Sequence, residues 1–212
     1  MVRQSRMNAH WNTLWLMWLL VFAFIGNAHA HSSLSMNLSP SHSAPALSTT
    51  ILLEVFVDFY CPHCHDFHKD VLPQLQQEFG AMLEIREIAF PVVQGQTQEA
   101  FDLYEAAKAE GKGPTIASVI FRVLQEERKS LRNPQVRSAI LQEVGLDPER
   151  IESHIRSGKA AKGLERGMSQ AAQYGITFIP VAVVDRAYVL LDTSAKSISE
   201  AIHSVLHERA KP

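Results

Sequence analysis

The chain has 212 residues, of which 46% are hydrophobic and 20% charged, with a formal net charge of −2. This length is enough for one domain with a buried core. Because the charge is nearly balanced and no basic run is present, nucleic acid is excluded as an expected partner. Two cysteines in a chain of this length also exclude a small scaffold held together by disulfides.

The first 30 residues are predicted to be a secretory signal peptide. Arg3 and Arg6 give a positive start, residues 14–25 are an unbroken apolar run, and Ala28 and Ala30 fit a small-residue cleavage site. The apolar run is shorter than the roughly 20 residues that a membrane-spanning helix needs. We therefore expect cleavage after Ala30 rather than a membrane anchor, and export to an oxidising compartment.

Residues 31–48 are rich in serine and carry no Asp, Glu, Lys or Arg, which predicts a flexible leader. The alternative is an arm that becomes ordered in an oligomer. The sequence leaves the oligomeric state open.

The next segment reads as a strand, a helix and a second strand. Residues 50–60 are almost continuously apolar, which predicts a central strand covered on both faces. Helical spacing follows from Pro62 to Phe79, with a kink expected at Pro73. Residues 83–93 predict a second strand, parallel to the first and joined to it by a right-handed crossover.

Residues 97–173 have a helical pattern throughout and predict an all-helical insertion. Asn133-Pro134 and Asp147-Pro148 each pair an N-cap residue with a proline at the first helical position. The last of four apolar stripes is predicted to contain Leu164, Met168, Ala171 and Ala172.

Strand character returns at residues 177–184 and 188–191, with a short hairpin connection between them. A final amphipathic helix follows. Ser197 and Glu200 are predicted to form its capping box.

Cys61-Pro62-His63-Cys64 lies where the first strand meets the first helix. A thiol at a helix N-terminus meets unpaired backbone N–H groups and the positive end of the helix dipole, which favour the thiolate. A bridge across so short a loop stabilises a fold little, so redox chemistry explains the pair better. We expect Cys61 to be the exposed nucleophile and Cys64 the buried resolving thiol.

A C-x-x-C at a strand-to-helix junction, in this order of elements, is the thioredoxin pattern. The residues FYCPHCHDF, the predicted export and the helical insertion together resemble the DsbA-like thiol–disulfide oxidoreductases of the bacterial periplasm, over about residues 50–207. The resemblance implies an α/β thioredoxin fold with an all-helical insertion between the second strand and the cis-proline strand. Residues 49–96 and 174–212 would then be its two halves.

The resemblance also assigns site residues. Thr177-Phe178-Ile179-Pro180 looks like the cis-proline loop that faces the dithiol in this family. Pro180 would act at the catalytic centre, and Ile179, Phe178 and Tyr60 would border a substrate groove.

His63 is expected to set the direction of the reaction. An imidazole beside Cys61 favours its thiolate, which stabilises the reduced form and makes the disulfide a stronger oxidant.

The sequence departs from the family pattern at one carboxylate. The family often carries a buried acid six residues before the first cysteine, where this chain has Val55. Glu54 and Val55 should point to opposite faces of the strand. We expect Glu54 at a strand edge and Asp58 at the helix entry, and a proton relay through either stays open.

The leading hypothesis is a periplasmic disulfide oxidase that acts on unfolded or partly folded exported proteins without a bound cofactor. The resemblance implies a quinone-linked membrane partner of the DsbB type. One alternative is a disulfide reductase or isomerase of the same fold.

Another alternative is a periplasmic copper- or zinc-binding protein that uses Cys61, Cys64 and His68. Helical geometry turns His65 away from Cys64 and His68 by about 100°.

Overall fold

The structure is a computed structural model that describes residues 50–211. The predicted signal peptide, its cleavage site and the predicted leader lie outside these residues. Within this range, no helix is long and apolar enough to cross a bilayer.

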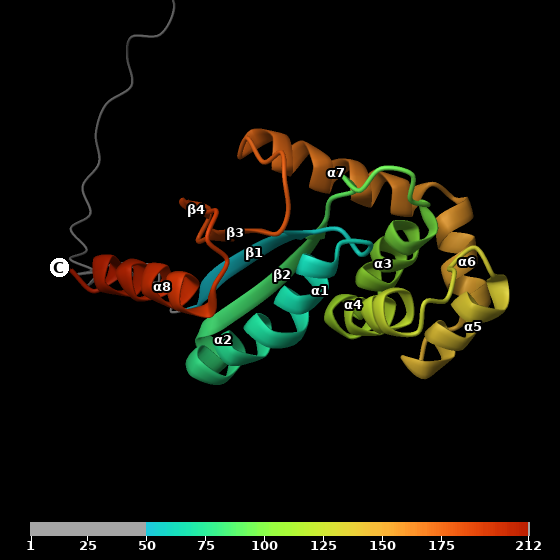
Figure 1. The fold of residues 1–212 in the computed structure, drawn as a ribbon, viewed down its shortest axis with the longest axis horizontal. Helices are drawn as coiled ribbons and strands as arrows, with labels where there is room; N and C mark the ends of the chain where they lie inside the picture. Colours follow the sequence, from blue (N-terminus) through green and yellow to red (C-terminus); the bar gives the residue numbers. More distant parts are fainter. Residues whose placement is uncertain (1–49, 212) are drawn as a thin grey trace, which may run out of the picture. The chain divides into compact units, whose positions relative to one another are not determined.

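Four strands form one mixed sheet in the order β2-β1-β3-β4 (Figure 1). The central strand β1 (Ile51–Val57) pairs in parallel with β2 (Leu83–Ala89) and antiparallel with β3 (Val181–Val184). The edge strand β4 (Tyr188–Leu190) pairs antiparallel with β3. The predicted central strand and its parallel neighbour are thus confirmed.

The first two strands end earlier than predicted. The cause is Asp58, whose carboxylate takes the N–H groups of Tyr60, Val92 and Val93 away from any strand pairing. The expected strand residues after Val57 and Ala89 therefore form turns and loops.

The helix after β1 is continuous but irregular. It consists of α1 (Pro62–Asp66), the π-helical turn η1 (Phe67–Val71) and α2 (Leu72–Phe79), and the short 3₁₀ turn η2 (Gly80–Met82) follows. In the wide turn the Leu72 N–H donates to the Phe67 carbonyl, five residues back. A kink was predicted at Pro73; the structure has a widened turn just before this proline, which has no N–H to donate.

Helices fill the chain between β2 and β3. They are α3 (Glu99–Ala109), α4 (Gly113–Phe121) with the π-helical turn η3 (Arg122–Glu126), α5 (Pro134–Glu143), α6 (Pro148–Arg156) and α7 (Lys159–Gln173). Both predicted N-caps are confirmed, because the Asn133 and Asp147 side chains accept from the backbone N–H two residues on. The break at Gly158, where φ is +75°, was not predicted.

The buried face of α7 differs from the predicted stripe. Met168 is 46% exposed and Ala172 also faces solvent. Glycines replace them on the packed side, because a Cβ on Gly163 would lie 2.5 Å from Glu105 Oε2. The prediction was wrong because a pattern of apolar side chains takes no account of glycines, which permit close packing.

The last elements are the β3–β4 hairpin and α8 (Ala195–Arg209). Its N-cap is Ser194, whose side chain accepts from the Ser197 N–H at 3.2 Å. The predicted capping box at Ser197 and Glu200 was wrong by one turn, because Ser197 is already inside the helix.

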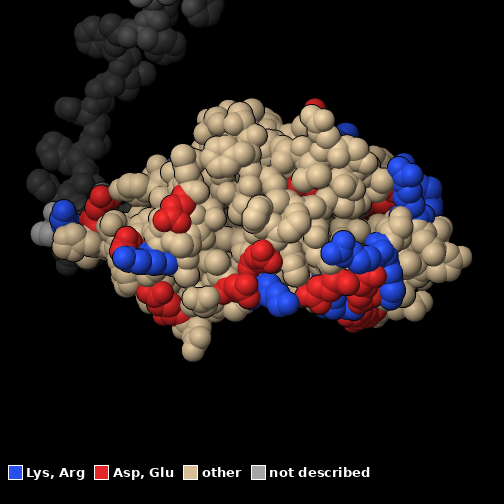
Figure 2. Space-filling view, viewed as in Figure 1, with Lys and Arg blue, Asp and Glu red and all other residues tan. Residues whose placement is uncertain are grey.

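The sheet separates two apolar clusters. Leu53, Val55 and Val57 pack with α2 and α8 on one face, while Phe56 packs against the C-terminal end of α7 on the other. Figure 1 shows α2 and α7 on opposite sides of the sheet. The larger cluster includes both cysteines. In Figure 2 charged side chains of both signs are interspersed along the lower part of the face, and the upper part, over α7 and the hairpin, is mostly uncharged.

Candidate active site

The dithiol sits at the junction of β1 and α1, as expected. Cys61 is the N-cap residue of α1, with φ −90° and ψ 119°, and its N–H donates to the Asp58 carbonyl at 3.0 Å. Both cysteines are free thiols. Cys61 is 8% exposed and Cys64 is 0% exposed. The expectation of an exposed Cys61 was therefore wrong, because it packs into the large apolar cluster, although it remains the more accessible thiol.

The helix start leaves one backbone donor beside Cys61. The Cys61 carbonyl accepts from the N–H groups of Cys64 and His65, both at 3.1 Å, and Pro62 has no N–H. The His63 N–H donates to no protein acceptor within residues 50–211. His63 is the second residue of the helix. The N–H at this position is one that the side chain of an N-cap residue normally accepts as a hydrogen bond. A thiolate at Cys61 therefore has an N–H available to stabilise it.

Cys64 has the opposite environment. Burial raises the pKa of the Cys64 thiol, and a hydrogen bond with the Asp58 backbone only partly opposes that shift. The Cys64 sulfur therefore favours the protonated form, which needs no solvation. The two cysteines are three residues apart. An available backbone N–H lies at the helix start beside Cys61, whereas Cys64 is fully buried and favours the neutral thiol.

Asp58 fixes the segment that carries Cys61. The residue is fully buried, its Oδ1 accepts from the Tyr60 N–H at 2.9 Å, and its Oδ2 accepts from Val92 and Val93 at 2.9 and 2.8 Å. Its predicted place at the helix entry is confirmed. Its link to the loop after β2 was missed, since nothing in the sequence pairs positions that far apart.

The cis-proline loop and His63 meet at one depression. The Ile179–Pro180 peptide bond is cis, as expected. Phe178, Ile179 and Pro180 line an open depression of about 510 Å³ together with His63. Phe178 is 47% exposed. The structure thus brings together four of the predicted site residues from segments more than a hundred positions apart.

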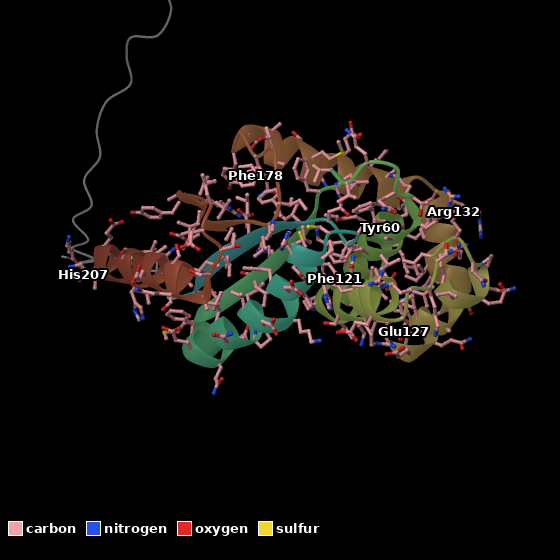
Figure 3. All side chains as sticks on the ribbon, in the orientation of Figure 1. Tyr60, Phe121, Glu127, Arg132, Phe178 and His207 are labelled. Carbon is pink, nitrogen blue, oxygen red and sulfur yellow. The ribbon has the colours of Figure 1, made fainter. Side chains whose placement is uncertain are left out.

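Tyr60 lies elsewhere. Its hydroxyl is 2.9 Å from Thr97 Oγ1 and its ring centroid is 6.0 Å from that of Phe101, so it packs against the start of α3. Figure 3 shows Phe178 and Tyr60 well apart. Tyr60 is not among the residues that line the depression.

Glu54 is not at a strand edge, because β1 is the central strand. It is 3% exposed and accepts from Gln170 Nε2 at 2.7 Å and from the Tyr174 hydroxyl at 3.1 Å. Its strand neighbour Val55 packs in the cluster that contains both cysteines. The predicted opposite orientation of these two side chains holds, and Glu54 faces α7 instead of the dithiol.

The two histidines after the dithiol have structural partners. His68 Nδ1 lies 2.8 Å from Glu87 Oε1, and its Nε2 lies 2.8 Å from Ser118 Oγ. His65 Nε2 lies 3.2 Å from Glu126 Oε1. Within residues 50–211, no three metal-ligating side chains converge. Both ring nitrogens of His68 already have partners on β2 and α4, which counts against the alternative of a metal site that includes His68.

The DSBA-like thioredoxin domain family matches residues 52–202 of the chain. The chain belongs to this family. Its fold is accordingly the thioredoxin fold with a helical insertion between β2 and β3, as the resemblance implied.

Individual relatives of the family are distant in sequence. The chain is 22% identical to the thiol:disulfide interchange protein DsbA of Pseudomonas aeruginosa over 60% of each chain. It is 24% identical to that of Azotobacter vinelandii over 70% of this chain and 69% of the relative. The match to the first of these thus spans less than two thirds of that protein.

A crystal structure of a single-residue variant of Pseudomonas aeruginosa DsbA superposes with a TM-score of 0.63 at 21% identity, over 80% of this chain and 91% of the other. At this identity, the likeness establishes the fold alone.

Proposed function

We propose that this chain catalyses thiol–disulfide exchange on unfolded or partly folded exported proteins in the periplasm, and that it acts as a disulfide oxidase. The observation that carries the proposal is the unequal pair. Cys61 is the N-cap residue of α1, where the His63 N–H has no acceptor within residues 50–211, whereas Cys64 is fully buried with a raised pKa. An exchange enzyme needs one sulfur that accepts attack and leaves as a thiolate, and one that is shielded.

The reaction starts from the Cys61–Cys64 disulfide. A substrate thiolate attacks Cys61 Sγ, a bond forms between the two sulfurs, and the Cys61–Cys64 bond breaks with its electron pair on Cys64. Because burial raises the pKa of Cys64, this sulfur takes up a proton. A second substrate thiolate then attacks the substrate sulfur and expels Cys61 as a thiolate. The substrate is oxidised by two electrons, and the pair is reduced by two.

The accessible sulfur must be the one attacked. Cys64 is 0% exposed and Cys61 is 8% exposed, so a substrate sulfur reaches Cys61 first. His63 would favour the Cys61 thiolate as a leaving group and thereby shift the equilibrium toward transfer of the disulfide to the substrate.

The other predicted residues have supporting roles in the proposal. Pro180, Ile179 and Phe178 would place a substrate backbone beside the dithiol as an added strand. Tyr60 would act through its position before Cys61, where its ring packs against the start of α3. A quinone-linked membrane protein of the DsbB type would take the two electrons and restore the disulfide.

The deciding experiment is the equilibrium redox potential of the protein against glutathione. A potential above about −200 mV would support the oxidase, because reduced substrates would then be oxidised. A lower potential would overturn it in favour of a reductase or isomerase. Incubated with oxidised glutathione, Cys64→Ser should form a stable mixed disulfide through Cys61 with release of one glutathione thiol, and Cys61→Ser, which keeps only the shielded sulfur, serves as its matched control.

A further inference from the structure

The depression that His63, between the two cysteines in the sequence, lines with the cis-proline loop has an acidic rim. Asp66 and Asp70 lie four residues apart on the helix that follows Cys61, so they share one of its faces, and Asp192 reaches the depression from the turn between β4 and α8. Neither lysine nor arginine is among its lining residues. His63 is its one basic side chain.

These aspartates lack the cationic partner that many other surface acids of the described chain have. Examples of such pairs are Glu126 with Lys69 at 3.1 Å and Glu152 with Arg137 at 2.8 Å. None of the three aspartates has a Lys or Arg partner within residues 50–211, and Asp66 contacts only His65 Nδ1, at 3.7 Å.

Asp192 is held in the charged form. The Ser194 backbone N–H, 3.0 Å from Asp192 Oδ1, and the Ser194 hydroxyl lower the pKa of this carboxyl. It therefore remains a carboxylate at neutral pH and below.

Apolar side chains lie beside the aspartates. Phe178 is 47% exposed and Leu191 is 67% exposed, and both line the depression. Large apolar side chains exposed in a concave site indicate a surface that binds apolar groups.

We propose that this site prefers substrate segments in which the reacting cysteine lies within a few residues of a lysine or arginine and of an apolar side chain. The proposal rests on the proposed thiol–disulfide exchange and names the substrate class for it. A cation would meet three carboxylates that have no Lys or Arg partner, and the apolar side chain would cover Phe178 and Leu191. Complementary charge also raises the rate of encounter.

The test compares three reduced peptides with one cysteine and one leucine, which differ only in carrying lysine, glutamine or glutamate near the cysteine. The readout is the rate constant for mixed-disulfide formation with the oxidised protein, divided by the rate with oxidised glutathione. This division removes the effect of the neighbouring charge on the peptide thiol itself. At low salt the lysine peptide should exceed the glutamate peptide about three- to tenfold, and 1 M salt should remove most of this difference.

Variants assign the effect to the rim. Asp70→Asn and Asp192→Asn should each reduce the preference for the lysine peptide over the glutamate peptide about twofold, because each removes one carboxylate. Glu149→Gln changes the net charge equally at an exposed position on α6, outside this depression, and should leave the ratio unchanged. Equal rates for the three peptides, or a preference that both aspartate variants retain, would overturn the proposal.

Failure of the proposed thiol–disulfide exchange would give a different result. A protein that oxidises neither the peptides nor glutathione lacks the exchange activity altogether. The same peptides with serine in place of cysteine would still report the preference through their dissociation constants, measured by fluorescence anisotropy of labelled peptides. Equal constants for the lysine and glutamate forms would count against the acidic rim alone.

Discussion

A Cβ placed on Gly167 of α7 would lie 2.9 Å from Cγ2 of Ile88 in β2. It would also lie 3.1 Å from the backbone oxygen of Ala89, an atom that cannot rotate aside. Gly167 therefore lets α7 lie directly against the C-terminal end of β2.

Gly167→Ala should lower the free energy of unfolding by about 1–3 kcal/mol, because the added carbon forces helix and strand apart. The loss should occur although alanine favours a helix over glycine by about 1 kcal/mol. Urea unfolding of the reduced protein measures it. Ser169→Ala, on the exposed side of the same helix, is the control and should change stability by less than about 0.5 kcal/mol. An unchanged Gly167→Ala stability would contradict the close packing.

Tyr174→Phe should lower the free energy of unfolding by about 1–3 kcal/mol. It removes the hydroxyl that donates to Glu54 Oε2 and leaves a buried carboxylate oxygen without that donor. Tyr188→Phe is the matched control, because its hydroxyl donates to Glu208, an exposed acid that water can solvate. Equal losses in the two variants would show that Glu54 is not specially dependent on α7.

Cys64 should make the reduced protein less stable as the pH rises above about 9. Burial raises the pKa of this thiol in the folded state, so the unfolded chain loses its proton first and the folded state binds more protons. The free energy of unfolding then falls by up to about 1.36 kcal/mol per pH unit.

The comparison is between Cys61→Ser and Cys61→Ser/Cys64→Ala, which isolates Cys64 and prevents the disulfide. The free energy of unfolding is measured at pH 8, 9 and 10. It should fall more steeply with pH in Cys61→Ser than in the double variant, and only above about pH 9. Tyrosines titrate in both variants and cancel. If the free energies of unfolding of the two variants change with pH in parallel, the pKa of Cys64 is not raised in the folded state.

His63→Ala should lower the redox potential by on the order of 30 mV or more, since each tenfold change in the equilibrium constant is about 30 mV for two electrons. The imidazole is exposed, two positions after Cys61, and in the proposed function it favours the Cys61 thiolate of the reduced form. His65→Ala is the control, because His65 contacts Glu126 and lies outside the depression. If the potentials of both variants equal that of the unaltered protein, His63 has no directing role.

Local patterns in the sequence predicted the parts of the fold that depend on neighbouring residues. Asn133 and Asp147 were identified as caps because a short side chain before a proline reaches only its own helix. The order of elements followed from periodicity, and the dithiol junction followed from the strand–helix boundary at Cys61.

Apart from the capping box at Ser197, which was misplaced by one turn, the site predictions that failed concern contacts between separate segments. Glu54 was expected at an edge, but its strand is central, and the partners that allow its burial lie on α7 more than a hundred residues later. The contacts of His68 with Glu87 and Ser118 also join it to other elements, 19 and 50 residues away. Spacing along one helix shows which side chains share a face, but not which strand or helix covers it.

Asp58 joins the peptide that leads into Cys61 to the loop after β2 through three backbone hydrogen bonds. One wall of the site is therefore built into the rigid frame of the sheet. Phe178 and Leu191, which line the depression, stand in connecting segments instead. Under the proposed function, the attacked thiol is thus tied to the frame of the sheet, whereas the apolar side chains that meet the substrate belong to loops.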